Sequence, residues 1–165
     1  MRRQAGLTLI EVLVVLAIIA ILMALGMPAL GDFLQNGRVK AVASEMRDGL
    51  LAARTEAIRC NKSVTLTSTG VGWSFTDCSG NTRSRSASSN ESSVSVTYAA
   101  GAGTTYATFT SQAITFSGAG RTSAGAGSFN VSATGADLTL RVLINAGGLV
   151  RICNPNAATG AADAC

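Results

Sequence analysis

The stretch Val12–Leu25, VLVVLAIIAILMAL, decides how this chain can fold, because every residue in it is apolar. It lies inside Leu7–Leu30, which is predominantly apolar and exceeds the length of about 20 residues that a helix needs to cross a bilayer core. Arg2 and Arg3 precede it, and basic residues favour the cytoplasmic side of a membrane. The sequence therefore predicts that residues 7–30 form a transmembrane helix, with the N-terminus inside and the rest of the chain outside.

The composition excludes several classes of protein. Charged residues make up 13% of the 165 residues, and the net charge of +4 is a mild excess of bases. Histidine is absent, which removes Ser-His-Asp and Cys-His catalysis and most catalytic zinc sites. The acidic residues beyond Cys60 lie in polar or loop contexts without a partner motif: Asp77, Glu91, Asp137, Asp163. We therefore expect no enzymatic activity and no cofactor.

Glu11 lies within the apolar segment and argues against two ordinary interpretations of it. A lone carboxylate in a membrane helix costs about 2.5 kcal/mol or more, and an uncleaved signal anchor leaves this cost unexplained. A cleaved secretory signal peptide is also disfavoured, since no small-x-small cleavage site follows and the apolar run continues into an amphipathic helix. A buried carboxylate must be paired or protonated.

The residues around Glu11 resemble the N-terminal signal of type IV prepilins and type II secretion pseudopilins: Gln4-Ala5-Gly6-Leu7-Thr8-Leu9-Ile10-Glu11-Val12. The resemblance implies that residues 1–6 are a leader peptide, that a prepilin peptidase cuts between Gly6 and Leu7, and that Leu7, where most members carry Phe, is then N-methylated. Glu11 and Pro28 match the family's carboxylate and its helix-disturbing proline, and both are assigned to assembly. In a filament, the N-terminal amine of a neighbouring subunit would pair with Glu11 and set the register between subunits.

Residues 31–59 are expected to continue the helix with an amphipathic pattern. Apolar residues recur at intervals of three and four, apart from one wider gap at the start: Phe33, Val39, Val42, Met46, Leu50, Ala53, Ala57. Gly26, Pro28 and Gly31 mark a weak point between the two halves of the helix, because proline removes a backbone hydrogen bond. We expect the apolar stripe to pack on a sheet formed by the rest of the chain.

Residues 60–165 are expected to form a β head, because apolar residues there alternate with a period of two. The alternating segments are Val64–Leu66, Trp73–Phe75, Val94–Tyr98, Ile114–Phe116, Phe129–Val131 and Leu138–Ile144. Asn145–Gly148 is typical of a turn, and Leu149–Cys153 is typical of its partner strand. Segments rich in Gly, Ser, Thr and Ala predict loops at Ser79–Ser93, Ala99–Thr105 and Gly118–Ser128. The sequence thus indicates an α+β fold, in which a long N-terminal helix packs on a small antiparallel sheet.

Four cysteines lie in the head, which the predicted topology places in an oxidising periplasm, where disulfides form. Three pairings are possible. We favour Cys60–Cys78 and Cys153–Cys165, because each pair closes a local loop, and each would contribute about 3 kcal/mol in the chain-entropy model. The spacings match no common zinc motif, so we expect no metal site.

The head is similar to the GspH/FimT group of minor pilins and pseudopilins. The matching segments are Arg54–Arg59, Val64–Leu66 with Gly72-Trp73, Ile114–Phe116 with Gly120-Arg121, and Gly147–Pro155. The resemblance implies a type IV pilin-like fold and a low-copy structural subunit at the tip or initiation complex of a type IV pilus or a type II secretion pseudopilus. Its implied partners are other major and minor pilins or pseudopilins, the prepilin peptidase/methyltransferase, and the bacterial inner membrane, which the chain would cross once with its head in the periplasm.

The alternative function is that of a pilus-tip DNA receptor for natural transformation, which some members of the FimT branch resemble. Their closing strand often carries Gly-Arg-x-Arg, whereas Gly148–Arg151 of this chain has Leu149 in place of the first arginine. The candidate DNA contacts are Arg121, Arg141 and Arg151. The head has six basic and four acidic residues, a net charge of +2 that is small for a DNA-binding surface. Because Arg83 and Arg85 are interpreted as solvated charges of a Ser-rich loop, DNA binding is not the favoured function.

Overall fold

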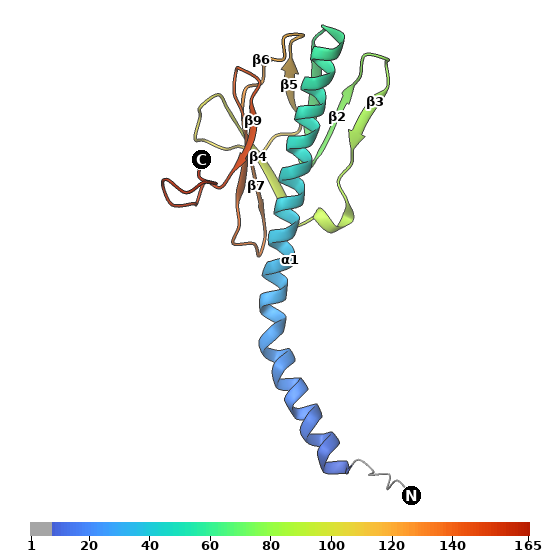
Figure 1. Cartoon of the computed structure of the whole chain (residues 1–165), viewed down its shortest axis with the longest axis vertical. Coiled ribbons are helices and arrows are strands. Elements are labelled where there is room, and N and C mark those ends of the chain that lie inside the picture. Colours follow the sequence, from blue (N-terminus) through green and yellow to red (C-terminus); the bar gives the residue numbers. More distant parts are fainter. Residues whose placement is uncertain (1–7) are drawn as a thin grey trace, which may run out of the picture.

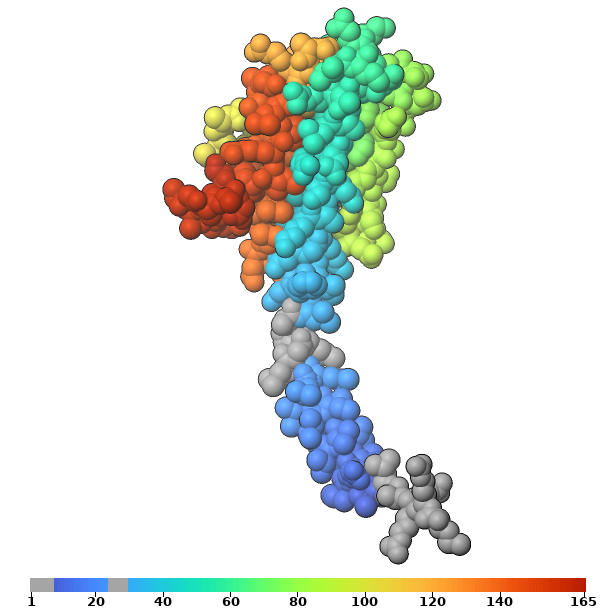
Figure 2. All heavy atoms as spheres, viewed as in Figure 1, coloured from blue at the N-terminus to red at the C-terminus, as the bar shows by residue number. Residues whose placement is uncertain are grey.

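The computed structural model describes residues 8–165, apart from the side chains of residues 24–29. A long helix, α1 (Leu9–Cys60), forms the spine of the molecule, and the strands gather around its C-terminal half (Figure 1). The N-terminal part of α1, from Leu9 to Leu34, projects from this head and is called the arm (Figure 2). The predicted cleavage position between Gly6 and Leu7 lies outside the described residues.

Capping residues define both ends of α1. The Thr8 hydroxyl accepts a hydrogen bond from the Glu11 backbone N–H at 3.3 Å, which satisfies one of the free donors of the first turn. At the other end Asn61 adopts a left-handed conformation with φ of 49°, which asparagine tolerates better than most residues, and the N–H of Lys62 bonds to the carbonyl of Ala57. The caps fix a helix that runs from the projecting arm to the far end of the head.

The helix passes through the predicted weak point at Pro28 without ending there, and its axis curves along its length (Figure 1). Within the described part of the chain, no helix combines the length and the apolar character needed to cross a membrane. The predicted transmembrane helix spans residues 7–30. Leu7 and the side chains of residues 24–29 are not among the described residues.

The apolar stripe of α1 packs into the head as predicted, with one exception. Six of its seven predicted members are at most 1% exposed: Val39, Val42, Met46, Leu50, Ala53, Ala57. Phe33 is 72% exposed, because the head first contacts the helix beyond it. At that point the Ser93 hydroxyl donates to the Gln35 side chain at 2.8 Å, and the Leu138 N–H donates to the Asn36 side chain at 3.0 Å.

The head contains two antiparallel sheets that both pack on α1, rather than the one small sheet expected. The first has the order β3-β2-β1-β5-β6, formed by Thr82–Arg85, Gly72–Thr76, Val64–Thr69, Gln112–Phe116 and Thr122–Ala124. The second has the order β4-β7-β8-β9, formed by Val94–Ala100, Gly127–Ala133, Leu140–Ile144 and Val150–Cys153. A short 3₁₀ helix, η1 (Ser89–Glu91), links β3 to β4. The edge strands β3 and β6 lie in segments predicted as loops, because they are short and polar.

Each sheet contributes its own apolar face to one core around the helix stripe. The fully buried aromatic side chains are Phe116 of the first sheet and Phe129 of the second. Trp73 lies against Gly49 of α1 so closely that a Cβ at Gly49 would be 2.5 Å from the indole ring. This contact explains a glycine inside a helix, where it otherwise costs stability.

We expect Leu50→Ala to lower the free energy of unfolding by about 2–5 kcal/mol, because Leu50 is fully buried between α1 and the sheets. Phe33→Ala is the matched control: it also truncates an apolar side chain of α1, but an exposed one, so the change should stay within about 0.5 kcal/mol. Urea unfolding of the detergent-solubilised chain, followed by Trp73 fluorescence, measures both. Equal effects of the two substitutions would contradict this boundary of the core.

Candidate functional site

The projecting arm of α1 carries an apolar surface that the rest of the chain leaves uncovered. Its large apolar side chains from Leu9 to Met23 are between 40% and 78% exposed. Leu30, Phe33 and Leu34 continue this surface to the base of the head. A monomeric soluble protein rarely exposes a contiguous apolar patch of more than a few hundred Å². An exposed apolar surface of this kind is typical of a site that contacts another molecule.

Glu11 is the one acidic side chain on the described part of this arm before Asp32, and it is exposed. Its neighbours on the helix surface are Val12, Val15 and Leu16, which line a shallow hollow beside it. Among the described residues, Glu11 takes part in no ion pair. Its position in the first turn is favourable for a carboxylate, since the free N–H groups there carry partial positive charge. Any cation that pairs with Glu11 must therefore come from the undescribed N-terminus or from another molecule.

The cysteines lie in the two pairs favoured from the sequence. Cys60, the last residue of α1, is bonded to Cys78 in the β2–β3 turn, with a Cα–Cα separation of 6.2 Å. Cys153, at the end of β9, is bonded to Cys165, with a Cα–Cα separation of 5.0 Å. The first disulfide holds the helix end on the first sheet, and the second holds the C-terminal loop on the second sheet.

Glu56 reinforces the junction at Cys60 and Cys78. Its carboxylate accepts hydrogen bonds from Arg59 at 3.0 and 2.5 Å and from the Cys78 backbone N–H at 3.1 Å. The Arg59 guanidinium and then the Cys78 N–H lower the pKa of Glu56 from 4.5 to about 2. Asp77 also has a lowered pKa, because the backbone N–H groups of Asn81 and Ser79 stabilise its charged form.

The same junction brings a carboxylate and two sulfur atoms together. In other proteins, groups of these kinds can bind a metal ion. The ligand atoms of Glu56, Cys60 and Cys78 lie within 4.8 Å of one another. The sulfur atoms are joined in a disulfide, so they offer no thiolate to a metal. The cluster therefore attaches the C-terminal end of α1 to the β2–β3 turn.

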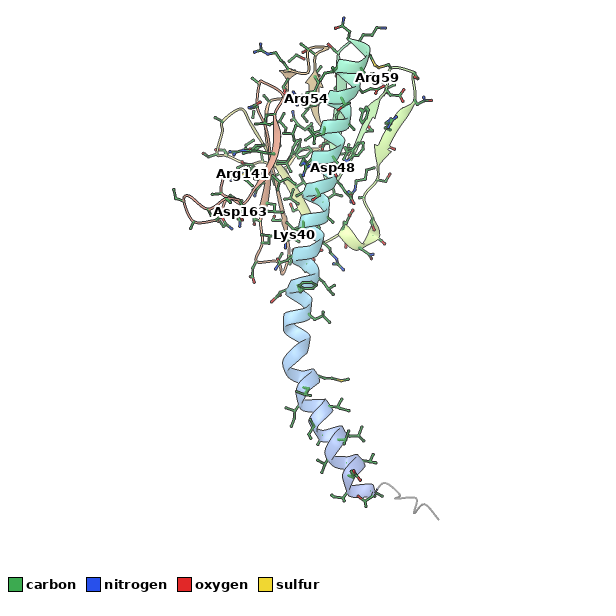
Figure 3. The ribbon with its side chains drawn as sticks, in the orientation of Figure 1. Lys40, Asp48, Arg54, Arg59, Arg141 and Asp163 are labelled. Atoms are coloured by element: carbon green, nitrogen blue, oxygen red, sulfur yellow. A yellow bond between two sulfur atoms is a disulfide. The ribbon has the colours of Figure 1, made fainter. Side chains whose placement is uncertain are left out.

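The three candidate DNA-contacting arginines do not form one open basic surface. Arg121 is exposed in the turn between β5 and β6. Arg141 and Arg151 lie on neighbouring strands, and the Arg141 guanidinium is 4.8 Å from the centre of the Tyr106 ring. Figure 3 shows Arg141 within the second sheet, on the side of the head opposite β2 and β3. Arg121 and Arg151 are thus exposed, whereas Arg141 is half-buried beside Tyr106.

The interpretation of Arg85 as a solvated loop charge is wrong. Arg85 lies on strand β3 with its side chain 15% exposed, paired with Glu45 of α1 and with Glu91 of η1. It also donates to the carbonyl of Val71 at 2.6 Å. No local sequence pattern predicts this role, because Glu45 lies 40 residues away along the chain and the pairing depends on β3 packing beside α1. Arg83, 3.6 Å from Asp77, has a side chain that is 63% exposed, in agreement with a solvated charge.

We expect Glu56→Gln to reduce the dependence of stability on pH between about 4.5 and 2. The pKa of Glu56 in the folded chain lies below its ordinary value. The stabilisation that the ionised carboxylate provides is therefore fully present above pH 4.5 and is lost as the pH falls through the pKa of the folded chain. Urea midpoints measured across this range should fall more steeply for the unsubstituted chain than for Glu56→Gln. Asp77 keeps its hydrogen bonds from the Asn81 and Ser79 backbone N–H groups in both proteins, so both curves retain that part of the pH dependence. Parallel curves would contradict the role of Glu56.

Two family models match this chain. The model described as "Type II transport protein GspH" matches residues 42–148, which cover the buried part of α1 and most of the head. The model described as "Prokaryotic N-terminal methylation motif" matches residues 1–27, which include Glu11. The two matches together include most of the arm and most of the head, and residues 28–41 and 149–165 lie outside them.

Relatives of known type extend these matches. Fimbrial protein Q of Moraxella bovis is 30% identical over 118 residues, covering 68% of this chain and 73% of that protein. The type IV minor pilin FimU of Pseudomonas aeruginosa has a similar structure, with a TM-score of 0.54 and 16% identity over 78% of this chain and 98% of FimU. The minor pseudopilin EpsH from the type II secretion system of Vibrio cholerae gives a TM-score of 0.51 and 14% identity over 73% of this chain and 99% of EpsH. These structures share the fold, and the family model together with Fimbrial protein Q shows that the chain belongs to the GspH family of minor pilins and pseudopilins.

Proposed function

We propose that this chain is a low-copy subunit at the tip or initiation complex of a type IV pilus or a type II secretion pseudopilus. Before assembly, the arm of α1 anchors it in the bacterial inner membrane, and the head lies in the periplasm. After assembly, the arms of neighbouring major and minor subunits cover one another. The role is structural, and no catalytic step is assigned to the chain.

The observation that carries this proposal is the contrast between the two halves of α1. The C-terminal half buries its apolar stripe in the head, whereas the arm exposes apolar side chains over several turns. Contacts with the head explain why the C-terminal half of α1 is apolar on one face, but they do not explain the apolar side chains that the arm exposes. A lipid bilayer and a bundle of the apolar arms of other subunits are both apolar surroundings, so one surface serves the membrane-bound and the assembled states.

Glu11 favours a role of the arm in setting the register between subunits, in addition to anchoring the chain in the membrane. A carboxylate in apolar surroundings is costly unless it meets a cation. A processed subunit would carry a methylated amine at Leu7, which precedes Glu11 by four residues in the sequence. Pairing between the amine of one subunit and Glu11 of its neighbour fixes the stagger of the two helices, because any other stagger leaves the carboxylate unpaired.

The alternative, a pilus-tip DNA receptor, has less support. A DNA-binding surface neutralises several phosphates with basic side chains that point into solvent. Here Arg85 is committed to two carboxylates and Arg141 to the Tyr106 ring. The remaining basic side chains of the head are too few for strong binding at physiological salt.

We expect processing to occur between Gly6 and Leu7. Mass spectrometry of the N-terminal peptide from the membrane-extracted protein should find methyl-Leu7. Gly6→Val should block cleavage, because a branched side chain crowds the peptidase site, whereas Ala5→Val, one residue earlier, should leave it intact. Retention of Met1 in cells with an active prepilin peptidase would refute the leader assignment.

We expect Glu11→Ala to leave the amount of protein in the membrane unchanged and to reduce its incorporation into filaments. Removing a charge from an apolar segment eases insertion, so loss of the protein is not the expected effect. The measurement is the ratio of the chain in sheared filaments to the chain in the membrane fraction. Asp32→Ala, which removes an exposed carboxylate from the same helix near the head, is the control. Normal incorporation of Glu11→Ala into filaments would contradict the proposal that Glu11 sets the register between subunits.

A further inference from the structure

A groove crosses the end of the second sheet, where β4 and β8 end and β7 and β9 begin. It encloses about 510 Å³. One wall is formed by residues next to β4 and β7, which are Gly101, Ala102, Ala126 and Gly127. The other is formed by residues of the β8–β9 hairpin, which include Leu143, Leu149 and Arg151. Figure 2 shows the yellow segment that follows β4 beside the orange β8–β9 region.

The wall that carries Leu149 is rigid. In the β8–β9 turn, the Asn145 N–H donates to the Leu149 carbonyl at 3.1 Å, and the Leu149 N–H donates to the Asn145 side chain at 2.9 Å. Gly148 has a φ of 81° and lies so close to the Gly120 carbonyl that a Cβ would be 1.9 Å from its oxygen. A partner that enters the groove therefore meets a preformed surface, and little conformational entropy is lost on that side.

The chemistry of the groove is apolar with one positive charge. Leu149 is 56% exposed, and Arg151 is the single charged residue in the lining. Among the described residues, no carboxylate forms an ion pair with Arg151, and its guanidinium makes a long contact of 3.5 Å to the carbonyl of Cys165. An unpaired arginine beside apolar side chains complements a carboxylate that neighbours an apolar side chain.

We propose that this groove docks an acidic segment from the head of a neighbouring filament subunit, with an apolar side chain on Leu143 and Leu149 and an Asp or Glu carboxylate on Arg151. The inference rests on the proposed function, which surrounds the chain with other subunits. A polypeptide is favoured over nucleic acid because the lining offers one arginine and several apolar side chains, whereas a phosphate backbone needs several cations.

The test uses the full chain in detergent micelles and fluorescein-labelled 12-residue peptides that tile the heads of the other subunits of the same filament. Fluorescence anisotropy should select peptides in which Asp or Glu lies within two residues of a large apolar side chain. Changing that acid to its amide should abolish binding. Arg151→Glu should weaken binding at least about tenfold, because it sets two carboxylates against each other, and Arg151→Lys should weaken it less.

Two controls separate this groove from the rest of the head. Arg83→Glu changes another exposed arginine, on the first sheet, and should leave peptide binding unchanged. Leu149→Ser removes one of the two apolar contacts while keeping Leu143 and Arg151, and it should weaken binding. Near-UV circular dichroism of each variant shows that its head is folded, which we expect because the changed side chains are exposed.

Three results would overturn the inference: no peptide binds, binding survives Arg151→Glu, or a labelled 20-base-pair DNA duplex competes for the groove and loses affinity with Arg151→Glu. The third would assign the groove to nucleic acid. The presence of the chain in sheared filaments is scored separately. A chain that enters filaments but binds no peptide overturns the docking site alone, whereas a chain absent from filaments overturns the proposed function.

Discussion

The burial of the α1 stripe holds the rest of the structure together. The two sheets are small, and aromatic residues make up only 5% of the chain, so neither sheet can build a core without the helix. Both sheets direct their apolar faces to the same side chains, from Val39 to Ala57. The helix is therefore the shared wall of one core, and the position of the head along α1 is set by where that stripe begins.

Polar contacts at both ends of the stripe complete this arrangement. At the base of the head, Gln35 and Asn36 accept hydrogen bonds from loops of the second sheet. Near the far end, Arg54 donates to the Gly120 carbonyl at 2.9 Å, and the Cys60–Cys78 disulfide holds the last turn. A head fastened at both ends of the stripe cannot slide along the helix, so its position on the C-terminal half of α1 is fixed.

The sequence was informative wherever a pattern repeats locally. The periodicity of three and four predicted the buried helix face, the period of two predicted the longer strands, and the prediction of the GspH family is confirmed by the family model. The misses depend on contacts between distant residues. Strands β3 and β6 have no apolar alternation, Phe33 continues the stripe but lies before the head, and Gly49 is needed only because Trp73 packs on it. The assignments of Gly6, Leu7, Glu11 and Pro28 remain predictions, since they concern processing and assembly.

Charge pairing separates the residues that hold the fold from those that face a partner. Inside the head, Glu56 is buried and Arg85 is largely covered, and each is paired or hydrogen-bonded by more than one group, as the cost of burying a charge requires. Glu11 and Arg151 lie beside apolar side chains without such partners among the described residues. An unpaired charge on an exposed apolar surface adds nothing to the stability of the single chain, and covering that surface without a counter-charge is costly. A partner that covers either position must therefore supply a counter-charge, a cation at Glu11 on the arm and an anion at Arg151 on the head.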